Sequence, residues 1–206
     1  GMDDVAADGD VDYTIVAASL SADPIYDGMD VAEVALTNLD DDTSFYVVSF
    51  QQDVDGYTGT VDTMVDQGSP TENFSTEDEL NIDNDSPGGS GNSVQSLLRF
   101  DDLFGERVGF IPSTATLHSA TLYLEVSNSG SALSLHRMLA DWNDSDTWTS
   151  LDNGLSADDV EVVSASDWLT GSVSTGLLEV DVLASMQAWL SDPSSNQGWA
   201  ILPTAG

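Results

Sequence analysis

The sequence contains no cysteine and no lysine, and three arginines are its only side chains with a permanent positive charge. Without cysteine, the chain can build neither a disulfide framework nor a thiolate metal site. Against the three arginines stand 37 acidic residues, which give a formal net charge of -34 at pH 7. Nucleic-acid binding depends on lysine and arginine side chains that neutralise phosphates. We therefore expect no nucleic-acid partner, and anionic membrane surfaces are disfavoured for the same reason.

Long apolar runs are also missing. No stretch approaches the ~20 consecutive apolar residues of a membrane-spanning helix, and no charged-then-apolar signal segment opens the sequence. We therefore expect no membrane insertion. A folded chain of 206 residues should bury about 70% of the surface that the unfolded chain exposes. A sizeable hydrophobic core can form at this length without covalent cross-links.

The acidic excess has two compatible interpretations. Repulsion among so many like charges destabilises the compact state at low ionic strength, so we expect the chain to fold in salt or with bound divalent cations. A solvated acidic surface would suit a halophilic or marine protein. The same carboxylates could also bind calcium, a hard cation that takes several carboxylate and carbonyl oxygens.

Alternation of apolar and polar residues predicts the central strands. In the segment 120–126, alanine, two leucines and valine alternate with threonine, tyrosine and glutamate, which is the pattern of a strand with one buried face. The segment 96–101 has the composition of a second strand, and 134–139 is the expected partner of this pair. We predict an all-β fold, an antiparallel β-sandwich of which these segments form the centre.

Shorter signals predict the remaining elements. One helix is expected over 182–190, where apolar residues form a stripe and Asp181 can act as N-cap; such a helix would lie over one end of the sandwich. Further strands are predicted at 13–17, 34–38, 45–50, 80–83, 161–163, 177–180 and 199–202, with a glycine-marked turn and a strand over 56–65.

The arginines have predicted structural roles. Arg137 shares a strand face with leucines, and an unpaired buried charge is strongly destabilising. We therefore predict that Arg137 pairs with a carboxylate or bonds backbone carbonyls, and that Arg99 does the same. Arg107 follows a glycine and a glutamate in an expected turn and is predicted to be solvated.

Residues 9–43 resemble the C-terminal part of the Calx-β-like repeats that occur in tandem in large bacterial surface proteins. The matching positions are 13–15, 21–24, 26, 28 and 34–42. A complete repeat of this kind needs about seven strands, and this stretch offers two. We therefore expect 1–43 to be a fragment of such a repeat with a linker.

Residues 44–206 resemble the DNRLRE domain, also described as the ninety-sixth carbohydrate-binding module family. The matching positions are 56–63, 73–74, 97–101, 111–112, 119–122, 142, 147–148, 181–182, 187–189 and 196–199. The six letters that name the family do not occur here. The resemblance implies a jelly-roll β-sandwich in a secreted or cell-surface multidomain bacterial protein, often attached to polysaccharide-degrading enzymes. Members that bind acidic polysaccharide such as alginate would offer basic residues, which this sequence lacks unless calcium bridges protein and ligand.

The aromatic residues supply the candidate ligand-binding positions. An exposed aromatic ring offers a large, rigid apolar face on which a sugar can stack. The tryptophans at 142, 148, 189 and 199 match family positions and are predicted to lie in the core. Tyr57 and Trp168 stand in expected loops, so we predict that these two residues form an exposed platform for a polysaccharide.

Two groups of acidic residues are candidate calcium ligands. Asp40, Asp41 and Asp42 lie at the junction of the two predicted modules, where a bound ion would stiffen the linker. Asp83 and Asp85 alternate as the first ligands of a calcium loop do, but the glycine and glutamate that an EF-hand requires do not follow at the right positions. We expect calcium, where it binds, to be structural, and a solvated acidic turn is the alternative at both places.

No catalytic constellation stands out. The two histidines, His118 and His136, have no third partner at ligand spacing, and no nucleophile elbow supports a serine triad. Paired carboxylates for glycoside hydrolysis are unconstrained among 37 acids. We predict a non-enzymatic carbohydrate-binding module with neighbouring domains in a longer chain. The alternative is a structural or adhesive spacer of a cell-surface protein without a glycan ligand, and an enzyme remains open only where carboxylates, or serine and histidine, converge in a pocket.

The calcium hypothesis predicts a stability change on metal removal. Adding a chelator at matched ionic strength should lower the melting temperature, because an ion that binds only the folded state stabilises it by mass action. Thermal unfolding followed by circular dichroism, with calcium added back as the control, measures this shift. An unchanged melting temperature would show that bound calcium does not stabilise the fold.

Overall fold

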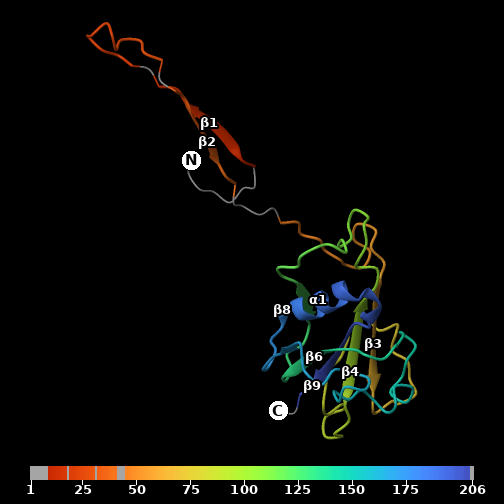
Figure 1. The fold of residues 1–206 in the computed structure, drawn as a ribbon. Coiled ribbons are helices and arrows are strands. Elements are labelled where there is room, and N and C mark those ends of the chain that lie inside the picture. The colour runs from red at the N-terminus through yellow and green to blue at the C-terminus, as the bar shows by residue number, and fades with distance from the viewer. Residues whose placement is uncertain (1–8, 18, 31, 41–44, 205–206) are drawn as a thin grey trace. The chain divides into compact units, whose positions relative to one another are not determined.

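A computed structural model describes residues 9–17, 19–30, 32–40 and 45–204. The chain divides into two compact units, Gly1–Val47 and Val48–Gly206 (Figure 1). No helix in the described part of the chain is long and apolar enough to cross a membrane.

The first unit is built on one antiparallel hairpin, β1 (Val11–Ile15) with β2 (Val34–Asn38). Directly paired residues of a sheet share a face, so the register gathers five large apolar side chains on one side. These residues are Val11, Tyr13, Ile15, Val34 and Leu36, each 40 to 52% exposed. A two-stranded ribbon cannot bury its own apolar face, and the unit has no core among its described residues.

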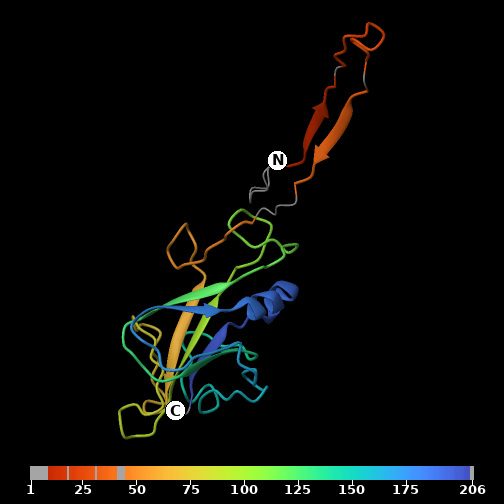
Figure 2. The same ribbon diagram turned by 90° about the vertical axis from the view of Figure 1, so that its left-hand side faces the viewer.

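The second unit is an all-β, antiparallel sandwich with one short helix near its C-terminus, as predicted (Figures 1 and 2). The larger sheet has the order β3 (Thr60–Asp66), β4 (Val94–Phe100), β9 (Trp199–Pro203), β6 (Leu133–Arg137), β7 (Trp168–Leu169). The smaller sheet pairs β5 (Thr121–Val126) with β8 (Gly176–Asp181). Helix α1 (Leu183–Ser191) and the 3-10 turn η1 (Pro193–Ser195) connect β8 to β9. In Figure 2, where β5 is green and β8 blue, the smaller sheet lies across the strands of the larger one.

The main core lies between the two sheets and under helix α1. Leu98 of β4, Leu122 of β5, Val180 of β8 and Trp189 of α1 all belong to it, together with Trp199 of β9. The Trp189 and Trp199 rings lie 4.6 Å apart between centroids, with a 56° angle between their planes. Burying such large apolar surfaces from both layers is the main force that joins the sheets.

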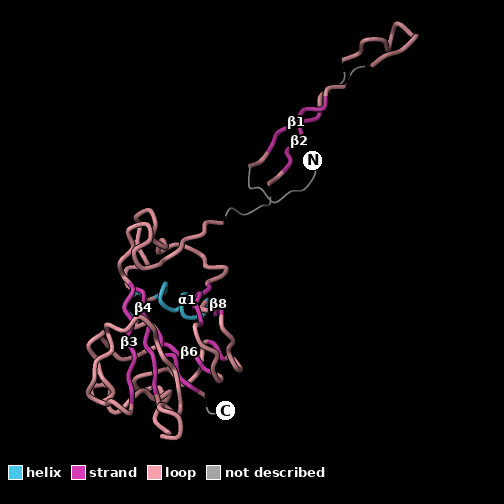
Figure 3. Tube along the Cα trace, turned by 180° about the vertical axis from the view of Figure 1, so that it is seen from behind, coloured by secondary structure: helices cyan, strands magenta, loops and turns pink. Residues whose placement is uncertain are grey.

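The other face of the larger sheet carries a second core. Residues alternate along β4, so that Leu97 faces this core while its neighbour Leu98 faces the first. The loop 139–165 covers the second core and contributes Trp142 and Trp148. Gln95 ties this loop to β4, because its side-chain amide donates to the Leu155 carbonyl at 3.0 Å and accepts from the Leu155 amide at 2.7 Å. Figure 3 shows how much of the unit consists of such loops.

The predicted central strands exist, but none of the three pairs with another. The expected partner, 134–139, lies largely in β6, which pairs with β9 and β7. The segment 96–101 lies largely within β4 of the larger sheet, and 120–126 becomes β5 of the smaller sheet. They face each other across the main core instead of sharing hydrogen bonds. Periodicity indicates which face of a strand is buried and leaves the identity of its neighbour open.

The prediction of a strand at 45–50 was wrong, since these residues form no strand. The pattern was apolar enough, but Phe45, Tyr46 and Val47 are 65 to 92% exposed. A strand needs a partner for its backbone groups, and no sheet in the described chain supplies one there. Short strands were expected at 80–83 and 161–163, but the structure has isolated β-bridges there, at Asp83 and Val162.

The predicted arginine pairings are confirmed. The Arg99 Nε atom lies 2.6 Å from Asp101 Oδ1, Arg99 Nη1 donates to the Trp142 carbonyl at 3.0 Å, and the guanidinium stacks 5.0 Å from the centre of the Trp142 ring. The Arg137 Nε atom lies 3.2 Å from Asp167 Oδ2, although the N–H is not aligned for a hydrogen bond. Arg107 is exposed, as predicted, with its guanidinium over the Phe110 ring.

Helix α1 begins one residue later than predicted, at Leu183. Asp181 therefore precedes the N-cap position, which Val182 occupies without a side-chain capping bond. The Asp181 carboxylate still accepts a hydrogen bond from the Leu183 amide at 2.9 Å. It satisfies one of the free amides at the helix start, so the predicted chemistry holds with a one-residue shift.

The tight approach of β9 to β4 predicts that Gly198 cannot be replaced. Gly198 has φ +70°, and a Cβ there would overlap the Leu98 carbonyl oxygen and lie 2.6 Å from the Cβ of Arg99. We expect Gly198→Ala to lower the free energy of unfolding by at least about 2 kcal/mol, measured by urea denaturation.

Two other glycines distinguish the effect of the close contact with β4 from the effect of the left-handed backbone conformation. Gly56 has a similar φ, +82°, with open space around it, and Gly171 has open space and no left-handed backbone. Gly56→Ala should cost about 1 kcal/mol from the backbone alone, and Gly171→Ala should cost close to nothing. Equal losses at Gly56 and Gly198 would show that the close contact with β4 has no effect.

Candidate ligand-binding pocket

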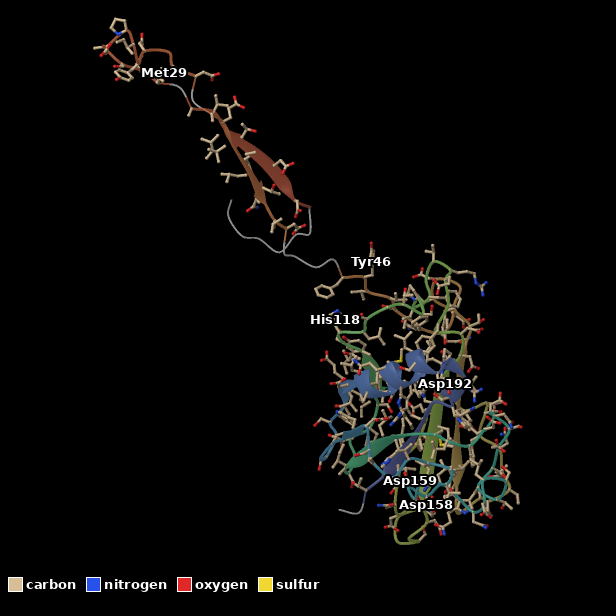
Figure 4. All side chains as sticks on the ribbon, in the orientation of Figure 1. Met29, Tyr46, His118, Asp158, Asp159 and Asp192 are labelled. Carbon is tan, nitrogen blue, oxygen red and sulfur yellow. The ribbon has the colours of Figure 1, made fainter. Side chains whose placement is uncertain are left out.

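A cavity of about 340 Å³ opens between the smaller sheet, strand β7 and the start of helix α1. Its lining combines one aromatic ring with hydroxyl, imidazole and carboxylate groups. The lining residues are His118, Ser119, Ala120, Thr121, Trp168, Glu179, Asp181 and Leu183. Figure 4 labels His118 at the end of the sandwich near helix α1, whereas Asp158 and Asp159 lie at the opposite end.

The strand register places the polar lining residues on one face. Thr121 pairs directly with Asp181, and Tyr123 pairs with Glu179. These four side chains share the outer face of the smaller sheet, because their neighbours Leu122 and Val180 are buried in the core. Sheet pairing therefore brings the two carboxylates together with a threonine hydroxyl and a tyrosine ring.

Tyr123 is the residue that the sequence analysis missed. It is 58% exposed and stands directly opposite Glu179 on the outer face of the sheet, although it is not part of the pocket lining. The signal was present, since the alternation in 120–126 already put this tyrosine on the solvent side. Its proximity to Glu179 follows from the pairing of β5 with β8 and could not be read from the sequence.

Trp168 lines the pocket, but it stands in the two-residue strand β7 and not in a loop. It pairs with Leu135 at the edge of the larger sheet, where the Asp167 amide donates to the Leu135 carbonyl at 2.9 Å and the Thr170 amide to the Leu133 carbonyl at 3.0 Å. A two-residue strand is too short for a periodic signal. The ring is half-buried and packs against the main core, so it is a fixed wall of the pocket.

A buried polar network supports this wall. The Asp167 side chain is 8% exposed; it accepts a hydrogen bond from the Ser185 hydroxyl at 2.7 Å and faces Arg137. The Ser185 hydroxyl in turn accepts from the Trp199 ring nitrogen at 2.8 Å. Because Asp167 immediately precedes Trp168, the network ties the position of β7 to helix α1 and strand β9.

Tyr57, the other predicted platform residue, is half-buried in a different part of the unit. Its hydroxyl donates to the Asp101 carbonyl at 2.7 Å, and its ring contacts Phe50 edge-on and stacks with Phe100. Burial raises the pKa of the Tyr57 hydroxyl, and the charges of Asp101 and Asp102 add to this shift. These contacts give Tyr57 a structural role, and the structure does not bring it together with Trp168 in the pocket.

The first group of predicted calcium ligands is only partly described. Asp41 and Asp42 lie outside the described residues. The Asp40 carboxylate accepts from the Gly9 amide at 2.6 Å, and the Asp40 amide donates to the Asp10 carboxylate at 2.9 Å. These bonds close the end of the β1–β2 hairpin.

The second group of acidic residues shapes its own loop. The Asp83 carboxylate accepts from the Asp85 amide at 2.8 Å, and Asp85 accepts from the amides of Gly89 and Gly91, both at 2.7 Å. These backbone bonds, first that of Gly89, lower the pKa of the Asp85 carboxyl. Within the described residues, no three acidic or histidine side chains are grouped to hold a metal ion. Calcium binding at these positions stays a prediction.

The remaining predicted residues lie in the core or in hydrogen-bonded positions. The four tryptophans expected in the core, Trp142, Trp148, Trp189 and Trp199, are all buried. His136 is buried, with one ring nitrogen 2.9 Å from the Val163 carbonyl and the other 2.9 Å from the Ser134 hydroxyl. These contacts agree with the predicted structural role of this histidine.

Comparison with known proteins returns no match: no family model, no curated protein and no solved structure matches this chain. The pocket must therefore be interpreted from its own chemistry.

The buried network predicts a large stability loss on removal of its carboxylate. Asp167→Ala leaves Arg137 without its partner and the Ser185 hydroxyl without its acceptor. Because the Arg137 side chain is 31% exposed, this loss should cost about 2 kcal/mol of unfolding free energy. Replacing both residues by apolar ones, Asp167→Leu with Arg137→Met, should recover much of this loss because no unpaired charge then remains. Chemical denaturation measures the unfolding free energy of the single and the double variant.

Asp78→Ala is the matched control for this loss, since Asp78 is exposed and its replacement should change stability by less than about 0.5 kcal/mol. A loss in Asp167→Ala no larger than that of this control would contradict the role assigned to the network.

Proposed function

We propose that the second unit is a non-catalytic carbohydrate-binding module of a secreted or cell-surface multidomain bacterial protein, and that its glycan binds in the Trp168 pocket. The observation that carries this proposal is the placement of an aromatic wall beside hydroxyl and carboxylate groups in one open cavity. The resemblance of 44–206 to the DNRLRE domain points to the same function.

The lining suits a sugar ring. The C–H face of a sugar is apolar and stacks on aromatic rings, while its hydroxyl groups donate hydrogen bonds to carboxylates. Trp168 supplies the stacking surface, and Glu179 and Asp181 supply acceptors. The cavity volume of about 340 Å³ is near the lower end of the range for small-ligand sites, roughly 300 to 1,000 Å³, so a short segment of a glycan chain would fill it.

A binding role fits the two carboxylates better than a catalytic one. Glu179 and Asp181 are both exposed, whereas the general acid of a glycosidase typically sits in apolar surroundings that raise its pKa. One Asp181 oxygen also accepts from the Leu183 amide. Calcium at Asp83 and Asp85, and at Asp40 to Asp42, belongs to the proposal as a structural cofactor.

A structural or adhesive spacer is the second candidate. The observation that favours it is the apolar face of the β1–β2 hairpin, where Tyr13, Ile15 and Leu36 are about half exposed. Such a face is stable only when another surface covers it, as in an array of consecutive repeats. This candidate requires no glycan ligand, so the two functions are distinguished by a binding measurement.

The proposal predicts that the full chain binds a glycan and that Trp168 is essential for this. Trp168→Ala should weaken binding at least about fivefold, since a stacked aromatic contributes on the order of 1 kcal/mol or more. Tyr123→Ala should weaken it less, because Tyr123 stands opposite Glu179 but is not part of the lining. A glycan array with calcium present identifies the ligand, and calorimetry measures the affinities.

Tyr26→Ala is the control variant, since Tyr26 is an exposed aromatic residue of the first unit and should leave binding unchanged. Absence of binding to every glycan would favour the spacer, and binding that survives Trp168→Ala would place the site elsewhere.

A further inference from the structure

We propose that the ligand of the Trp168 pocket is a glycan whose sugars carry free, protonated amino groups. This inference rests on the proposed carbohydrate-binding function and names the class of sugar. It follows from the charges that line the pocket, the engagement of the arginines elsewhere and the state of the helix start beside it.

The pocket offers negative charge to its ligand. Glu179 and Asp181 lie on the same exposed face of β8, two residues apart, and both line the cavity. Among the described residues, Glu179 has no cationic partner in the protein. His118 also lines the cavity.

No arginine is available to neutralise an acidic sugar. Arg99 is paired with Asp101 and stacked on Trp142, and Arg137 faces the buried Asp167. Arg107 lies over Phe110, and it is not part of the lining. The sequence has no lysine. A uronate or sulfate group in the pocket would lie close to the carboxylates of Glu179 and Asp181, and like charges repel at short range.

The N-terminus of helix α1 does not make the pocket favourable for an anionic ligand group. The N-terminus of a helix attracts anions, because its first amides are free and its dipole is positive there. In this chain the Asp181 carboxylate already accepts from the Leu183 amide. The protein's own carboxylate thus takes the position that an anionic ligand group would use.

The aromatic lining adds to the selection for a cation. An ammonium group is attracted to the face of an aromatic ring, most strongly to that of tryptophan. Trp168 lines the cavity, and Tyr123 stands opposite Glu179 across the sheet. An amino sugar would place its ring carbons on an aromatic face and its ammonium near a carboxylate. A neutral sugar would make the first of these contacts and not the second.

Two oligosaccharides of identical skeleton test the charge directly. Calorimetry should compare a glucosamine trisaccharide with the N-acetylglucosamine trisaccharide, on the full chain at pH 7. Salt of about 0.15 M limits the effect of distant charges, since its screening length is about 8 Å. We expect the amino form to bind at least about tenfold more tightly.

Two glutamates on the same sheet face separate a local effect from the effect of net charge. Glu179 lines the pocket, whereas Glu125 lies on the same outer face opposite Leu177 and does not. Glu179→Gln and Glu125→Gln each remove one negative charge. The preference for the amino form should fall at least about fivefold in the first variant and stay unchanged in the second, with equal melting temperatures showing that both variants fold.

The outcomes distinguish this inference from the proposed function. Equal or tighter binding of the acetylated sugar, with loss in Trp168→Ala, would overturn the inference and leave the carbohydrate-binding function in place. Equal losses in the two glutamate variants would also overturn it, because general attraction to an acidic protein would then explain the preference. Binding of neither sugar, nor of any other glycan, would overturn both.

Discussion

The buried carboxylate of Asp167 is the interaction on which the arrangement of the second unit depends. It faces Arg137 of β6 and accepts a hydrogen bond from Ser185 of α1, which in turn accepts one from Trp199 of β9. A charge in this position is tolerable only when its partners are all in place. The network therefore specifies how the helix, two strands and the segment before Trp168 fit together, beyond what apolar burial alone would specify.

The larger sheet places apolar residues on both faces, which lets an acidic chain of this size hold two cores. Adjacent residues of β4 and β9 face opposite ways, with Trp199 in one core and Ala200 in the other. The loop 139–165 covers the second core in place of a further sheet. The carboxylates are thereby left mostly at the surface, where many of them bond the amides of their own loops, as Asp85 and Asp159 do.

The pocket combines a rigid side with an exposed one. Trp168 is held by the edge of the larger sheet and by the network at Asp167, whereas Tyr123, Glu179 and Asp181 stand on the open face of the smaller sheet. A site with one preformed wall loses little conformational entropy when a ligand binds. The two carboxylates of the lining carry charge of the same sign, and this is the basis of the proposed selection for amino sugars.

The sequence by itself determined the all-β class, the buried face of β5, the helix before the last strand, and the need of Arg99 and Arg137 for partners. These features depend on local periodicity or on the cost of an unpaired charge, and both can be evaluated from neighbouring residues. Only the tertiary structure decided that 96–101 and 120–126 lie in different sheets, that 45–50 has no strand partner, and that Tyr57 is packed against Phe50 and Phe100. It also brought Trp168 beside Glu179 and Asp181. Strand pairing joins residues that are far apart along the chain, and periodicity carries no information about which strands become neighbours.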